Sequence, residues 1–201
     1  MKKQASSDLL QAIAVCCELT NTQLSQAAVR VMSDDLAQYP EQQVMGALHR
    51  CRREVRSHLT IADIVARLDD GRPGPEEAWA ICAPTLDDEG PTVVRTAEMD
   101  VAFGVALGCA HDKVAARMAF LESYRAQCMA ARSEHRPVRW QPSLGHDASG
   151  REGVLLSAVA QGKLAADHVR ALLPYMSPID PQAERILALR KPAKLLASGH
   201  D

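Results

Sequence analysis

Aromatic residues are scarce in this chain of 201 residues: they make up 3% of it, whereas hydrophobic residues make up 47%. A core of some size is therefore possible, but leucine, valine, alanine and methionine must fill it. A sandwich of β-sheets draws more on tyrosine, phenylalanine and threonine, so this composition favours helices. The length suits one large domain or two small ones.

Long apolar runs and a strong net charge are also lacking. No stretch approaches the roughly 18 apolar residues of a membrane span. The formal net charge is −2, so no global field draws the chain onto nucleic acid or membrane. Asp8 and Gln11 interrupt the apolar N-terminal patch, and no small-residue cleavage site follows, which argues against a signal peptide. We expect a cytoplasmic protein without a membrane partner.

The six cysteines form no CxxC pair and no zinc-ligand pattern. Cys51 and Cys128 fall on the apolar faces of expected helices, as buried free thiols of intracellular proteins do. We therefore predict neither a metal site nor a cofactor.

Apolar residues recur at helical spacing along most of the chain and predict an all-α fold. We expect a compact bundle of short helices over residues 1–70, a hinge at 71–75, a second helical region at 76–173 and a flexible C-terminal tail at 174–201. The only strand-like fragment is PTVVRT, residues 91–96. The longest helix is expected over 112–134, with one buried stripe: Val114, Met118, Leu121, Tyr124 and Cys128.

The stretch DDGRPGPEEAW, residues 69–79, could be a phosphate loop or a boundary between helices. A Walker-type loop needs a lysine followed by serine or threonine after a strand, and none of these is present. Gly71 instead suits the left-handed end of one helix, and Pro75 suits the first turn of the next. We therefore predict a helix boundary and no ATPase activity.

The loop GHDASGRE places His146, Asp147 and Ser149 close together in sequence. Sequence neighbours rarely hydrogen-bond as a catalytic triad does, and no GxSxG elbow exists. We interpret the loop as a turn that leads into a helix. We therefore expect that the protein is not an enzyme.

Four arginines stand against one glutamate between residues 49 and 58, a local excess of +3. Arg50, Arg53 and Arg56 recur every three residues and are expected on roughly one side of the third helix, away from Val44 and Leu48. The alternatives are a solvated helix face, or a surface that contacts nucleic-acid phosphates or an acidic protein. The proposed partner-binding residues are Arg50, Arg52, Arg53 and Arg56, with Arg190, Lys191 and Lys194 in the C-terminal tail.

Residues 20–70 carry the patterns LAQYP, VMGALHRCRREVRSH and LTIADIVARLDD. This segment resembles the N-terminal helical domain of the phage helicase loader-and-inhibitor family. The matching positions are Tyr39, Pro40, Val44, Ala47, Leu48, Leu59, Thr60, Ala62, Asp63 and Ile64. The remainder, with GRPGPEEAWA and PVRWQPSLGHD, is similar to uncharacterised phage and prophage proteins.

The resemblance implies binding to a hexameric replicative helicase through a flexible C-terminal segment, without an ATPase of the protein's own. The extra helical region at about 75–173 departs from the family, so the helicase-contact residues do not transfer. We expect a phage or prophage DNA-replication accessory protein that loads or inhibits the helicase. The alternative is a DNA-binding replication or transcription regulator that uses the same arginines.

Overall fold

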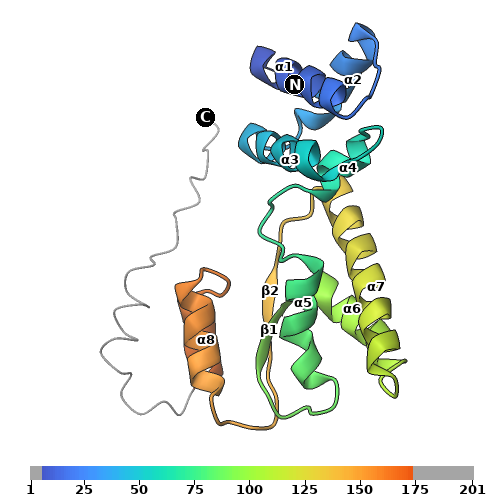
Figure 1. Ribbon diagram of the computed structural model, residues 1–201. Helices are drawn as coiled ribbons and strands as arrows, with labels where there is room; N and C mark the ends of the chain where they lie inside the picture. The colour runs from blue at the N-terminus through green and yellow to red at the C-terminus, as the bar shows by residue number, and fades with distance from the viewer. Residues whose placement is uncertain (1–5, 174–201) are drawn as a thin grey trace, which may run out of the picture. The chain divides into compact units, whose positions relative to one another are not determined.

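The computed structural model describes residues 6–173 (Figure 1). This part of the chain contains nine α-helices, one short 3-10 helix and one two-stranded sheet, so the expected helical fold is confirmed. It divides into two compact units. Unit 1 runs to Arg72 and includes Arg125–Val138, and unit 2 comprises Pro73–Tyr124 and the described residues from Arg139 onward. The expected tail at 174–201 lies outside the described residues.

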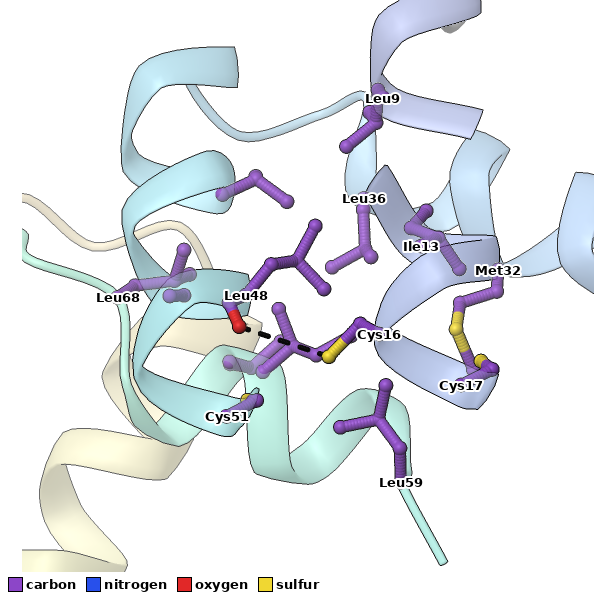
Figure 2. Close-up of a cluster of buried hydrophobic side chains, with 14 residues drawn as sticks. Leu9, Ile13, Cys16, Cys17, Met32, Leu36, Leu48, Cys51, Leu59 and Leu68 are labelled. Carbon is purple, nitrogen blue, oxygen red and sulfur yellow. Dashed lines mark hydrogen bonds between the residues drawn. The ribbon is translucent and has the colours of Figure 1, made fainter. Parts of the chain in front are cut away.

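Unit 1 contains α1 (Ser7–Leu19), α2 (Gln26–Leu36), α3 (Glu41–Glu54), α4 (Ile61–Ala66) and the last residues of α7 (Lys113–Ser133). Its core gathers apolar side chains from α1 to α4, and Figure 2 shows ten of them with labels. The residues with no exposed area are Ile13, Cys16, Leu36, Val44, Cys51 and Ile64. Cys16 also donates its thiol to the carbonyl of Leu48, with sulfur and oxygen 3.7 Å apart.

Hydroxyl side chains cap the starts of α1, α2 and α4, whereas α3 follows Pro40 without a side-chain cap. Thr60 caps α4 and forms a full capping box with Asp63. Ser25 caps α2, and its hydroxyl accepts the N–H of Ala28, whereas residues 20–22, which precede it, do not cap this helix. Thr20 instead donates to the carbonyl of Cys16 at the end of α1, 2.9 Å away.

Unit 2 packs helices around two short strands. Its elements are α5 (Pro75–Cys82), the 3-10 turn Ala83–Thr85, β1 (Val93–Thr96), α6 (Ala97–Leu107), the first half of α7, β2 (Trp140–Ser143), α8 (Arg151–Ala160) and α9 (Ala166–Leu172). β1 is the strand-like fragment that the sequence indicates. It pairs antiparallel with β2, which the sequence did not indicate.

The expected helix boundary is right at Pro75, which opens α5, but not at Gly71: α4 already ends at Ala66, so Gly71 has a left-handed φ without lying at a helix end. Gly71 has φ +87° and Gly162 has φ +74°. Glycine adopts this left-handed conformation without strain. Trp79 of α5 packs on Phe120 of α7 with the ring centres 5.3 Å apart.

The buried stripe of α7 is partly wrong. Leu121, Tyr124 and Cys128 are buried, but Val114 is 73% exposed and Met118 is 57% exposed. The face that packs inward runs through Ala116, Phe120, Tyr124, Cys128 and Ala131, mostly at intervals of four residues. Val114 and Met118 each precede a residue of this face, Ala116 or Phe120, by two positions, which is about 200° around a helix with about 3.6 residues per turn, so they point away from it.

All six cysteines are free thiols, and five of them are buried, as predicted. Burial raises the pKa of Cys51 to about 11 and the pKa of Cys82 to about 12, so both remain protonated at neutral pH. Within residues 6–173, no helix is both long enough and apolar enough to cross a bilayer.

Candidate partner-binding surface on α3

α3 separates an apolar face from a basic one. Its buried residues are Val44, Ala47, Leu48 and Cys51. The four arginines predicted to bind a partner, Arg50, Arg52, Arg53 and Arg56, are all exposed. The sequence therefore identified the buried side of this helix correctly.

The expected stripe of Arg50, Arg53 and Arg56 along one helix is wrong. α3 ends at Glu54, and Val55 has extended geometry with φ −79° and ψ 120°, so Arg56 lies beyond the helix. The chain must leave the helix here because Leu59 is buried and its N–H donates to the hydroxyl of Thr22 at 2.7 Å. The sequence pattern carries no sign of this contact, which spans 37 residues.

Arg50 is held by its own unit. Its guanidinium pairs with Asp69 at 3.3 Å and donates to the carbonyl of Arg67 at 3.2 Å. That carbonyl follows the last residue of α4, where backbone oxygens have no partner within the helix. Arg50 therefore acts as a cap for α4, a role that the sequence analysis did not give it.

Glu54 does not neutralise the arginines of its own helix. Its carboxylate lies 2.8 Å from the guanidinium of Arg67, which also approaches Asp63 at 3.7 Å. Glu54, the acidic residue nearest to these arginines in the sequence, thus pairs with Arg67. It does not neutralise the positive charge at the end of α3.

The residues that remain are Arg52, Arg53 and Arg56, which we call the basic cluster. Across residues 6–173, no carboxylate forms an ion pair with any of these three guanidinium groups. Arg52 and Arg53 occupy the last turn of α3. The negative end of the helix dipole favours a cation there by about 0.3–1 kcal/mol. Arg190, Lys191 and Lys194, the other predicted contacts, lie outside the described residues.

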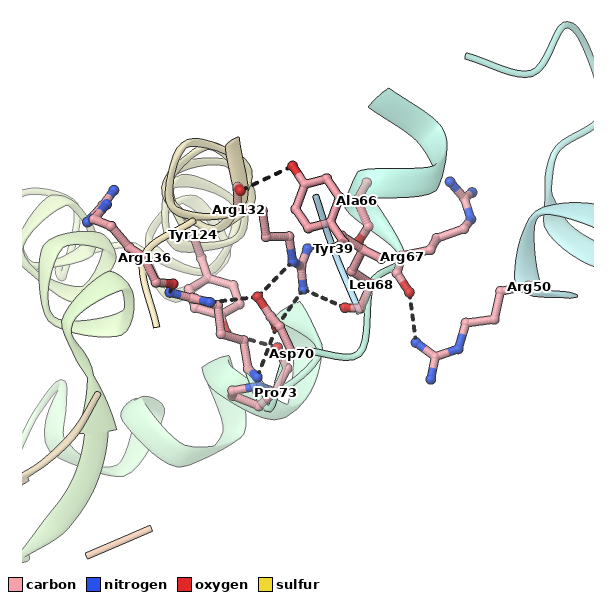
Figure 3. A network of polar contacts seen from close by, with 11 residues as sticks. Tyr39, Arg50, Ala66, Arg67, Leu68, Asp70, Pro73, Tyr124, Arg132 and Arg136 are labelled. Carbon is pink, nitrogen blue, oxygen red and sulfur yellow. Dashed lines mark hydrogen bonds and ion pairs between the residues drawn. The ribbon is translucent and has the colours of Figure 1, made fainter. Parts of the chain in front are cut away.

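A second charged group in unit 1 is structural. Arg132, near the end of α7, donates two hydrogen bonds to the carboxylate of Asp70, at 3.1 and 3.2 Å (Figure 3). It also donates to the carbonyls of Ala66 at 2.8 Å and Leu68 at 3.1 Å. Arg72 adds two more bonds to Asp70, from its guanidinium at 2.6 Å and from its backbone N–H at 3.2 Å. This network satisfies carbonyl groups at and just beyond the end of α4.

The pKa of Asp70 follows from this network. Burial alone raises the pKa of the carboxyl, but the hydrogen bonds and positive charge of Arg132 and the hydrogen bonds from Arg72 outweigh it, so the pKa lies below its usual value. Hydrogen bonds and cations favour the charged form of a carboxyl group. The carboxylate is therefore ionised throughout the neutral range.

The GHDASGRE loop forms a turn. The carboxylate of Asp147 accepts the backbone N–H of Ser149 at 2.7 Å, and the backbone of His146 donates to the carbonyl of Glu89 at 3.2 Å. Among the hydrogen bonds of the described region, none joins the side chains of these three residues to each other. The loop has the geometry of an Asx turn ahead of α8.

Known proteins offer no further guide to this surface, since no protein family, curated protein or solved structure was found to match the chain.

Proposed function

We propose that this protein is a non-catalytic accessory factor of phage or prophage DNA replication that binds a replicative helicase, as a loader or an inhibitor. The observation that carries the proposal is the basic cluster, Arg52, Arg53 and Arg56, exposed beside a helix whose opposite face is buried. The resemblance of residues 20–70 to helicase loaders and inhibitors supports the choice of partner.

The physical argument rests on charge that the protein itself leaves unmatched. Like charges a few residues apart repel each other by a few tenths of a kcal/mol per exposed pair. Arg50 and Arg67 relieve such repulsion with Asp69 and Glu54, whereas the basic cluster has no such carboxylate in the described region. An acidic surface on the helicase would supply one.

Duplex DNA is the alternative partner, because unpaired guanidinium groups also bind phosphates. A helix-turn-helix would place its second helix in the major groove. α4, which follows α3, has only six residues, and its Asp63 is engaged in the capping box. α4 therefore offers few side chains that could reach bases, which favours a protein partner.

The test is co-purification of the full chain with the host replicative helicase, with and without DNA. Changing Arg52, Arg53 and Arg56 together to glutamate should abolish the protein complex. A matched control changes Arg30, Arg125 and Arg139 to glutamate, since these are exposed and have no ion pair in the described region. The control has the same change in net charge and should bind as the wild type does.

Two results would contradict the proposal. Retention of the helicase by the triple variant would leave the basic cluster as a solvated surface. DNA binding by the wild type, with an affinity that falls with salt at a slope of about −0.9 per phosphate contact, would identify DNA as the partner instead.

A further inference from the structure

The two-stranded sheet of unit 2 has an edge whose backbone groups can be assigned from its register. Val93 lies opposite Ser143, Val94 opposite Pro142, and Arg95 opposite Gln141. In an antiparallel ladder, opposed residues alternate between pairs that exchange hydrogen bonds and pairs that do not. Proline has no N–H and in an edge strand favours the position whose nitrogen faces away from the partner strand, which assigns Val94–Pro142 to the pairs that do not.

The N–H and C=O of Val94 therefore point away from β2. The cap of α6 supports this assignment: the N–H of Thr96, two residues on and on the same side, donates to the sulfur of Met99 at 3.4 Å. Within residues 6–173, the backbone of Val94 forms no hydrogen bond with any group outside the two strands. Val94 is only 8% exposed. A buried backbone N–H without a partner is rare in folded proteins.

A groove of about 420 Å³ opens beside this edge. Its floor contains Thr92, Val93 and Val94, and its walls come from Ile81 of α5 and from the face of α8 that carries Gly153, Val154 and Ser157. The volume lies within the range of about 300–1,000 Å³ that is usual for ligand sites. The groove thus places unmatched strand groups next to apolar walls.

Gly153 keeps this groove open. A Cβ built at Gly153 would meet no atom within 4 Å, so the helix packing does not require glycine there. Glycine inside a helix is unfavourable relative to alanine. Its presence on a groove wall leaves room for another chain to approach.

The charge on the groove indicates which kind of side chain a bound molecule would place there. Lys163 is the only charged residue among those that line the groove. Its ammonium lies 4.4 Å from the centre of the Trp140 ring, and no carboxylate pairs with it in the described region. A carboxylate on the occupant would complement this lysine.

We propose that an extended peptide segment of a partner protein binds in this groove as a third strand on the free edge of β1. Its backbone pairs with the N–H and C=O of Val94, its apolar side chains contact α5 and α8, and an acidic side chain lies near Lys163. This is strand addition, in which main-chain bonds supply affinity and the flanking pockets supply specificity. The site does not involve the basic cluster, and it stands whether or not the helicase is the partner there.

The experiment selects eight-residue peptides from a random library on the full-length protein and then synthesises the peptides that bind. Gly153→Leu places a side chain in the groove and should weaken the binding of these peptides by about tenfold or more. A decrease of this size is what the loss of about one or two hydrogen bonds would cause. Gly104→Leu is the matched control, because its Cβ also meets nothing within 4 Å and it does not line the groove. It should leave binding unchanged.

A second measurement does not depend on any protein variant. N-methylation of peptide amides should weaken binding at alternate positions only, because every second amide of an added strand faces β1. Lys163→Glu should weaken selected peptides that carry an acidic residue, whereas the triple glutamate variant of the basic cluster should bind them normally. The proposal is overturned if no selected peptide is sensitive to Gly153→Leu, or if N-methylation has no alternating effect.

Discussion

The two units differ in how they satisfy backbone N–H and C=O groups that have no hydrogen-bond partner within a helix or sheet. In unit 1, arginine side chains donate to the backbone carbonyls around the end of α4. Arg67 donates to the carbonyl of Asp63, Arg50 to that of Arg67, and Arg132 to that of Ala66. In unit 2, the edge of β1 at Val94 receives no donor or acceptor from the described residues outside the two strands. Unit 1 therefore satisfies the carbonyls at the end of α4 with its own side chains, whereas unit 2 leaves the backbone groups of one strand edge without such partners.

This difference changes how charge should be interpreted in each unit. Arginine in unit 1 is partly structural, so a run of basic residues does not by itself mark a binding surface. Within the basic run at residues 49–58, assigning Arg50 to the end of α4 leaves Arg52, Arg53 and Arg56, the basic cluster, as candidates. In unit 2 the candidate arises from unmatched backbone groups, and side-chain composition gives no hint of it.

The largest expected effects compare the two cores. Leu48 is 2% exposed and lies within a large cluster. Leu48→Ala should therefore lower the free energy of unfolding by about 2–4 kcal/mol. Leu155 lies in the smaller cluster around α8. Leu155→Ala should cost less, since side chains beside a groove can relax into the cavity.

Chemical unfolding can separate these two effects. Circular dichroism follows the helices of both units, whereas the two tryptophans, Trp79 and Trp140, lie in unit 2 and report on it alone. An equal or larger loss for Leu155→Ala would show that the α8 cluster is as tightly closed as the core of unit 1.

The next effect concerns the ion network. The side chains of Arg132 and Asp70 keep 12% and 17% exposure. Asp70→Ala should therefore destabilise unit 1 by about 2–3 kcal/mol, below the roughly 3–5 kcal/mol of a fully buried pair.

Asp69→Ala is the control for this network. The Asp69 side chain is 71% exposed and pairs with Arg50. Loss of such an exposed pair should cost at most about 1 kcal/mol. Amide hydrogen exchange in α4 measures both variants, and equal losses would contradict a special role for Asp70.

Acid should reveal the same network. The pKa of Asp70 is lower in the folded protein than in the unfolded chain, where the ordinary value of 3.8 applies. Its contribution to stability is therefore complete above about pH 4 and is lost as the pH falls through the folded value. Asp70→Asn should flatten this part of the pH profile of unfolding. An unchanged acid transition would mean that other carboxylates dominate it.

The sequence predicted helices better than it predicted contacts between them. Thr60 and Pro75 mark helix starts through local rules, and both do so here, whereas Gly71 has the expected left-handed φ but lies beyond the end of α4 at Ala66. The end of α3 and the cap formed by Arg50 depend on Thr22 and Asp69, partners distant in sequence. No local pattern contains such partners, which is why Arg56 was misplaced.

The same limit applies to the candidate sites. The basic cluster could be predicted because charge excess is visible along a single helix. β2 could not, because Trp140–Ser143 is short, contains a proline, and becomes a strand only by pairing with β1. An isolated pair of strands has little stability of its own. The groove at Val94 follows from that pairing, so it was equally out of reach.

The smallest effects come from two glycines that should respond to alanine in opposite directions. Gly71 in unit 1 has φ +87°. An L side chain in this region is strained by about 1–2 kcal/mol, so Gly71→Ala should destabilise. Gly153 in unit 2 lies inside α8 with open space at its Cβ. Gly153→Ala should therefore stabilise by about 0.5–1 kcal/mol through helix propensity alone.

Urea unfolding compares the two glycine variants, and a shift in midpoint at constant slope reports a change in stability. Opposite signs would show that Gly71 is required by backbone geometry and that Gly153 is not. The glycine at 153 would then need a reason outside the folded chain, and room for an added strand on β1 is such a reason. If Gly153→Ala destabilises instead, side chains fill the groove in solution, and the open edge that distinguishes unit 2 from unit 1 is lost.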